Sequence, residues 1–96
     1  MNVAGNNTPF HISANTAGVQ VRAGNGQLHT VTINTKGGSS NLLTLYDGTS
    51  TGGTVIAAID TTSAVGTLKY DVQFLAGLFA VLATGTAADI TITVTS

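Results

Sequence analysis

The chain has 96 residues, of which 7% are charged and none is cysteine, and its formal net charge is −1. This charged fraction is far below the roughly 25% of ordinary soluble domains. Because only three residues are cationic, the chain has no basic stripe that could bind phosphates, and nucleic-acid binding is not expected. The missing thiols exclude disulfides and cysteine-based zinc sites, and the longest apolar run, 78–83, is too short to span a bilayer, so no membrane contact is expected.

Low charge combined with many threonines and glycines is typical of a β-protein inside a larger assembly. In such a setting the neighbouring subunits, rather than surface charges, keep the protein from aggregating. A monomeric β-module could share this composition. The length suits one domain with a small core, so contacts between subunits would add stability.

The first nine residues contain three asparagines, a glycine and the only proline of the chain. They predict an extended arm, 1–9, ahead of a single domain, 10–96. Because the arm has neither a charged segment nor an apolar run, we expect no secretory signal. Apolar and polar residues then alternate over 10–13, which predicts a short strand that ends at the turn 15–18.

A first hairpin is expected over 19–34. The segments 19–22 and 27–34 alternate apolar and polar residues, and Asn25-Gly26 between them is a strong signal for a tight hairpin turn. A flexible loop rich in glycine and serine follows at 36–40.

A second hairpin is expected over 42–60. Alternation over 42–46 leads into Asp47-Gly48, a second turn signal follows at Gly52-Gly53, and an extended apolar run resumes over 55–59. Because no set of catalytic groups surrounds this hairpin, it indicates the architecture of the fold and no chemical activity.

The last third predicts three more strands. The segment 67–74 alternates most clearly, which indicates one buried and one solvent-facing side and places Tyr70 and Phe74 in the core rather than on a sugar-stacking surface. The segment 78–84 is apolar on both sides, as expected of a strand buried on both faces, and 90–95 alternates aliphatic residues with threonine.

No window keeps the spacing of apolar residues that a long helix needs. Seven or eight short strands linked by turns rich in glycine and asparagine predict an all-β fold, an antiparallel β-sandwich or small jelly roll.

A strand that is apolar on both sides needs two surfaces to pack against. The inner faces of a sandwich bury one set, so the outer sets of 55–59 and 78–83 are candidates for a subunit interface. Alternatively, loops or the N-terminal arm cover them within one chain. The candidate interface residues are Val55, Ile56, Ala57, Ala58, Ile59, Leu78, Phe79 and Val81.

Candidate catalytic groups are few. His11 and His29 have no acidic neighbour or nucleophile close in sequence, so structural or solvent-facing roles are expected. The four aspartates are each explained by a turn, a strand end or a polar strand face, and there is no glutamate. The single carboxylate of the loop 47–53 is a weak basis for a calcium site. We therefore expect no enzymatic activity, no metal site and no cofactor.

Three motifs carry a family resemblance, namely Gly26–Val31, Leu43–Gly48 and Leu68–Phe74 with the following Gly77-Leu78. They resemble small virion proteins of tailed bacteriophages. The resemblance implies a β-sandwich that decorates or cements the capsid as a homotrimer, bound to the major capsid protein on the virion surface after synthesis in the bacterial cytoplasm. It also implies that the arm straps onto a neighbour through Asn2, Val3, Asn6, Asn7, Thr8 and Pro9.

Similar modules occur in tails and fibres, which keeps an alternative open. The chain would then be a carbohydrate- or receptor-binding β-module, and this alternative predicts an exposed aromatic pair.

Overall fold

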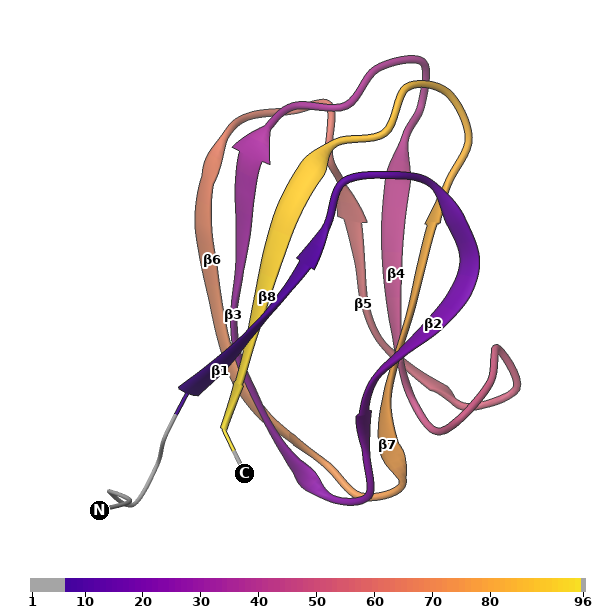
Figure 1. The fold of residues 1–96 in the computed structure, drawn as a ribbon, viewed down its shortest axis with the longest axis vertical. Helices are drawn as coiled ribbons and strands as arrows, with labels where there is room; N and C mark the ends of the chain where they lie inside the picture. The colour runs from indigo at the N-terminus through magenta and orange to yellow at the C-terminus, as the bar shows by residue number, and fades with distance from the viewer. Residues whose placement is uncertain (1–6, 96) are drawn as a thin grey trace.

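The structure is a computed structural model that describes residues 7–95, and these residues form eight strands (Figure 1). Within this range the chain has no helix that is long and apolar enough to cross a membrane. The strands are β1 (Asn7–Ile12), β2 (Thr16–Ala23), β3 (Gly26–Thr35), β4 (Leu42–Asp47), β5 (Thr54–Asp60), β6 (Gly66–Phe74), β7 (Gly77–Ala83) and β8 (Asp89–Thr95).

The strands form two antiparallel four-stranded sheets that pack face to face (Figure 1). Sheet A has the order β1-β8-β3-β6, and sheet B has the order β2-β7-β4-β5. The pairs are nested, because β4 pairs with β5, β3 with β6, β2 with β7 and β1 with β8. A long hairpin rolled up in this way is a jelly roll, so the predicted fold class is confirmed.

The core lies between the two sheets and is built from alternate residues of the inner strands. Sheet A contributes mainly branched aliphatic side chains from β3 and β8, and sheet B contributes leucine and alanine from β4 and β7. Alternation is the cause, since successive side chains of a strand point to opposite faces of its sheet. The largest fully buried hydrophobic residues are Phe74, Leu28, Leu43, Leu45, Leu78, Leu82, Ile90, Ile92 and Val31.

The hairpin expected over 42–60 is confirmed. β4 pairs with β5 from Leu42 opposite Asp60 to Asp47 opposite Thr54, with the connection between them. One register shift interrupts the ladder, because Ile56 is an extra residue on β5.

The hairpin expected over 19–34 is wrong. β2 pairs with β7, whereas β3 pairs with β6 and β8, so the two strands belong to different sheets. The link between them is a corner of the sandwich, where Gly24 adopts a φ of 76°. An Asn-Gly signal marks a sharp reversal of the chain but does not decide which sheet the chain enters next.

β6 is less buried than its alternation predicts. Phe74 is buried and Tyr70 is half-buried, but Leu68 and Val72 remain 41% and 38% exposed. β6 lies at the edge of sheet A, and a bulge interrupts its pairing with β3. At this bulge Asp71 has a φ of 51°, in the left-handed region that aspartate tolerates better than most residues.

The outward side of β7 is also less buried than expected. Leu78, Ala80 and Leu82 point into the core, whereas Phe79 and Val81 are half-buried on the outer surface of sheet B. The prediction that this strand is buried on both faces is therefore wrong for its outer side in the single chain.

The predicted N-terminal arm is too long at its domain end. Asn7, Thr8 and Pro9 belong to β1 and pair with Thr95, Val94 and Thr93 of β8. Alternation continues through this segment, and the proline is accommodated because β1 is an edge strand. Asn2, Val3 and Asn6 lie outside the described residues.

All four edge strands carry features that discourage pairing with another sheet. β2, β5 and β6 each have at least one register shift in the ladder to their neighbour, and β1 contains Pro9. Bulges and proline on edges are common protections against edge-to-edge aggregation.

One asparagine connects the four loops at one end of the sandwich. Asn41, in the β3–β4 loop, donates from Nδ2 to Asn15 Oδ1 at 2.9 Å and to the carbonyl oxygen of Thr84 at 2.8 Å. Its Oδ1 accepts from the Thr61 hydroxyl at 2.7 Å and from the Ala88 amide at 3.1 Å. Asn41 and Thr61 are fully buried, so these bonds form away from water.

The opposite end is held by Asp47 and Gln20. The Asp47 carboxylate accepts from the backbone amides of Leu75 at 3.0 Å and Ala76 at 2.9 Å, in the β6–β7 turn. Gln20 Nε2 donates to the carbonyl oxygens of Arg22 at 2.7 Å and Leu78 at 2.9 Å. The link between β6 and β7 is thus tied to β4, and the start of β7 is tied to β2.

Candidate interaction surfaces

The outer face of sheet A is polar and rich in threonine. Thr91 and Thr93 of β8 lie opposite Thr32 and Thr30 of β3, and Thr32 shares a hydrogen bond of 3.0 Å with Thr67 of β6. Two histidines, each bonded to an aspartate, lie on this same sheet and span its four strands.

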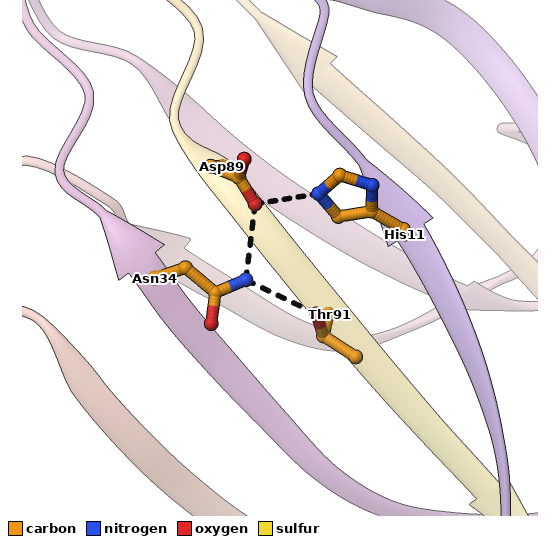
Figure 2. Close-up of polar contacts among 4 residues, drawn as sticks. All are labelled: His11, Asn34, Asp89 and Thr91. Carbon is orange, nitrogen blue, oxygen red and sulfur yellow. Dashed lines mark hydrogen bonds and ion pairs between the residues drawn. The ribbon is translucent and has the colours of Figure 1, made fainter.

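The first histidine belongs to a cluster of four residues, His11, Asn34, Asp89 and Thr91, which we call the His11 cluster (Figure 2). His11 Nε2 on β1 lies 2.6 Å from Asp89 Oδ1 on β8. Asn34 Nδ2 on β3 donates to the same oxygen at 3.0 Å and to Thr91 Oγ1 at 3.1 Å. The cluster therefore joins three neighbouring strands.

The geometry of the His11 cluster is that of a clasp between strands. A catalytic triad of the Ser-His-Asp type places the histidine between the carboxylate and the hydroxyl. Here the Thr91 hydroxyl accepts from Asn34, which lies on the other side of Asp89 from His11 (Figure 2). The side chains of His11 and Asp89 are 58% and 37% exposed, so the pair lies on an open surface rather than in a cleft.

The second histidine joins β3 to β6. His29 Nδ1 lies 2.6 Å from Asp71 Oδ1, and Lys69 Nζ lies 3.5 Å from Asp71 Oδ2. His29 occupies the position opposite the bulge of β6, so the pair spans the irregular part of this ladder. Both histidines thus have structural contacts, with acidic partners that are distant in sequence.

Groups that could hold a metal do not gather on this surface. Over residues 7–95, histidine and acidic side chains form no group of three or more that could bind an ion. The Asp47 carboxylate, considered above for calcium, instead accepts hydrogen bonds from the amides of Leu75 and Ala76.

Each of the four aspartates has a lowered pKa, because its carboxylate accepts hydrogen bonds. The amides of Ala76 and Leu75 lower the pKa of Asp47, and Thr62 lowers the pKa of Asp60. His29 is the largest cause of the lowered pKa of Asp71. For Asp89 the pKa is lowered by Asn34 first and by His11 second.

Acid is therefore expected to destabilise the fold. A lowered pKa in the folded state means that the ionised carboxylate contributes stability above its unfolded pKa of about 3.9, and this contribution disappears as the pH falls through the folded pKa. We expect the melting temperature to fall below about pH 4. Asp47→Ala should melt lower than the wild type at pH 6, and the difference should shrink as the pH falls below about 4. A difference that stays constant down to pH 2 would contradict the anchoring role of the Asp47 carboxylate.

The outer face of sheet B is apolar at its centre. Tyr46 of β4 lies opposite both Phe79 of β7 and Val55 of β5. The next row places Val81 and Ala58 on either side of Thr44. We call Tyr46, Val55, Ala58, Phe79 and Val81 the apolar face.

Two local features shape the apolar face. The extra residue Ile56 reverses the alternation of β5, so Val55 faces outward beside Tyr46 with 55% of its surface exposed. Gly18 of β2 leaves room for the Phe79 ring, because a Cβ at this position would overlap the ring. The rings of Tyr46 and Phe79 are 6.5 Å apart and tilted by 58°.

The structure divides the candidate interface residues into two groups. Val55, Ala58, Phe79 and Val81 lie on the apolar face and are exposed or half-buried. The others point inward: Ile56 packs against the core, and Ala57, Ile59 and Leu78 are buried in it. These four residues are therefore not available to a partner, because alternation and the β5 bulge turn them toward sheet A. Tyr46 was missed because it lies outside the two apolar runs.

A second apolar region lies along the side of the sandwich where β5 and β6 are the edge strands. A hollow of about 170 Å³ opens there, between Ile33, Ile59 and Leu68 among others. Among residues 7–95, five of the six exposed large hydrophobic residues lie on β5, β6 or their connections, namely Val55, Val65, Leu68, Val72 and Leu75.

Comparison with known proteins bears on the fold. No protein-family model and no curated protein matches the chain. Among solved structures, the chain is similar to the Drosophila NLP-core, whose structure is described as giving insight into pentamer formation and histone binding. The TM-score is 0.58 at 11% identity, over 93% of this chain and 95% of the NLP-core chain. At this identity the likeness shows a shared fold alone.

Proposed function

We propose that this protein is a non-enzymatic structural protein of a phage virion, a decoration protein that associates with itself and stabilises the shell by binding the major capsid protein. The observation that carries the proposal is the apolar face of sheet B in a chain with very few charges. The phage setting, the homotrimer and the position on the capsid surface rest on the family resemblance of the sequence.

The distribution of polar and apolar residues supports self-association through faces. Exposed apolar surface on one side of a soluble sandwich is typical of an interaction site. Strand addition between sheets is disfavoured, since every edge strand carries a bulge or a proline. A protein that binds only the assembled shell stabilises it by mass action, without chemistry.

The NLP-core comparison supplies an alternative stoichiometry. The NLP-core structure is described in terms of pentamer formation, and a five-membered ring is therefore the stoichiometry to test against the proposed trimer. Histone binding is not part of the proposal, because four aspartates, no glutamate and a net charge of −1 provide little attraction for a basic partner.

The test places like charges on the apolar face. Val55→Glu/Ala58→Glu changes two exposed positions of β5 and should leave the fold intact. Burying unpaired carboxylates in an interface costs several kcal/mol, so self-association should weaken by at least about 100-fold. Light scattering should show about three times the chain mass of 9.6 kDa for the wild type and a single chain mass for the variant.

The matched control is Leu75→Glu, which adds a charge at a side chain that is 70% exposed and lies outside the apolar face. It should associate and bind isolated capsid shells like the wild type. A wild type that is strictly monomeric at high micromolar concentration would refute self-association, and failure to bind shells of the parent phage would refute the decoration role.

One observation favours a second candidate function, a glycan- or receptor-binding module of a tail or fibre. Tyr46 and Phe79 form an aromatic pair on the outer surface of sheet B, although this pair is half-buried and the alternative predicts an exposed one. Saturable glycan binding that is lost in Tyr46→Ala would support this function. A glycan array without signal would count against it.

A further inference from the structure

We propose that β1 exchanges between copies of this protein, so that β1 of one chain pairs with β8 of another. This inference deepens the self-association proposed above and rests on it, since contact through the apolar face holds two chains at the effective concentration that exchange of β1 needs. The site is the position that β1 occupies within its own chain, and the occupant is the same strand of a second copy.

β1 is weakly attached to the rest of the molecule. Among residues 7–95, β1 pairs with β8 alone. Of its side chains from Thr8 onward, Ile12 is buried, Phe10 is half-buried, and Thr8, Pro9 and His11 are exposed. Of these side chains, only Phe10 and Ile12 therefore have to leave the core when the strand separates, and the proline donates no backbone hydrogen bond.

The edge of β8 that β1 covers is regular. The register runs unbroken from Asn7 opposite Thr95 to Ile12 opposite Ile90. The other three edge strands, β2, β5 and β6, all have register shifts in the ladders to their neighbours. An uncovered β8 is thus the place in this fold where an incoming strand can form a continuous antiparallel ladder.

The connection between β1 and β2 provides a hinge. Asn15 fixes the start of β2, because its Nδ2 donates to the carbonyl oxygen of Gly85 at 2.9 Å and its Oδ1 accepts from Asn41. Ser13 and Ala14 are exposed and lie between this anchor and β1. An open hollow of about 290 Å³, lined by Ser13, Ala14 and Asn15 among others, lies beside this connection and gives it room to move. Short connections of this kind favour exchange of the terminal element.

The His11 cluster determines which strand fits and in which register. When β1 pairs in its native register, His11 meets Asp89, which is already held by Asn34 (Figure 2). A slip of two residues would keep the apolar side inward but would place Pro9 or Ser13 beside Asp89, and the clasp would be lost. Every contact of the single chain forms again between two chains, so a second copy is the matching partner.

The experiment uses the absence of native cysteine. Pro9 and Thr93 lie directly opposite each other, at a separation that suits a disulfide. Pro9→Cys chains and Thr93→Cys chains are mixed, incubated at an oligomer-forming concentration and oxidised. Neither chain can form this bond internally, so a 9–93 disulfide between chains reports exchange. We expect this disulfide to form far more than the product of Pro9→Cys with Thr67→Cys, since Thr67 lies on the other edge of sheet A.

Two further variants make the result decisive. Pro9→Cys/Thr93→Cys in one chain should close an internal disulfide, which shows that the substituted strands still pair. Asp89→Ala removes the acceptor shared by His11 and Asn34. When this substitution is added to the Thr93→Cys chain, cross-linking should become several-fold faster. An unchanged rate would overturn the role of the His11 cluster in holding β1. Cross-linking no higher than in the Thr67→Cys control, while the internal disulfide forms, would overturn exchange. Cross-linking is measured without capsid shells, so a failure to cross-link would not contradict the decoration role. A failure to bind capsid shells would likewise not contradict the exchange of β1.

Discussion

Asn41→Ala is expected to lower the free energy of unfolding by about 3 to 4 kcal/mol, because a buried polar group left without its partner costs about 1 to 3 kcal/mol and a cavity adds to this cost. The Ala88 amide loses its acceptor, and the carbonyl oxygen of Thr84 loses its donor. For a domain of this size the change corresponds to a fall in melting temperature of at least about 12 °C. Thermal unfolding followed by circular dichroism measures it.

The control for Asn41→Ala is Asn34→Ala. Asn34 also bonds across strands through its side-chain amide, but it is exposed, and water can replace its partners. Its substitution should cost less than about 1 kcal/mol. Equal losses for the two variants would show that burial is not the reason for the importance of Asn41.

Gly85→Ala is expected to destabilise the fold by more than about 3 kcal/mol, through overpacking and lost hydrogen bonds. A Cβ at position 85 would overlap the carbonyl oxygens of Gly38 and Ser39, which are backbone atoms and cannot turn away. The β3–β4 and β7–β8 loops would have to separate. This separation would break the two backbone hydrogen bonds of 3.0 Å between Gly38 and Thr86.

Gly24→Ala is the matched control for Gly85→Ala. Both glycines have positive φ, 76° at Gly24 and 61° at Gly85, so both substitutions carry the cost of a left-handed alanine, about 1 kcal/mol. Gly24, however, has open space where a Cβ would lie. Urea unfolding of the two variants separates backbone strain from collision, and a similar loss in both would contradict the collision argument.

Local patterns predicted strands well and their partners less well. The hairpin of β4 and β5 follows from alternation and turn residues, because both strands lie in one sheet. The same kind of pattern around Asn25-Gly26 gave the wrong pairing, since nested pairing sends β2 and β3 to different sheets. That choice depends on β6, β7 and β8, which no local window contains.

The candidate surfaces were predictable only in part. The apolar runs indicated the apolar face, but Val55 faces outward on the strand whose Ala57 and Ile59 face inward only because of the bulge at Ile56, which is a property of paired strands. His11 and Asp89 are far apart in sequence, and only the β1–β8 register brings them together. Asn41 follows a glycine- and serine-rich loop, and its burial reflects the meeting of four loops.

The position of β8 has a consequence for how the protein is made. β8 lies between β1 and β3 in sheet A, yet it is the last of the eight strands to leave the ribosome. Until then sheet A has a gap at its centre, and β1, though synthesised first, has no strand to pair with. We therefore expect nascent chains to fold only after β8 emerges. On polysomes, a waiting β1 can meet the β8 of a neighbouring chain, which makes synthesis the natural moment for exchange.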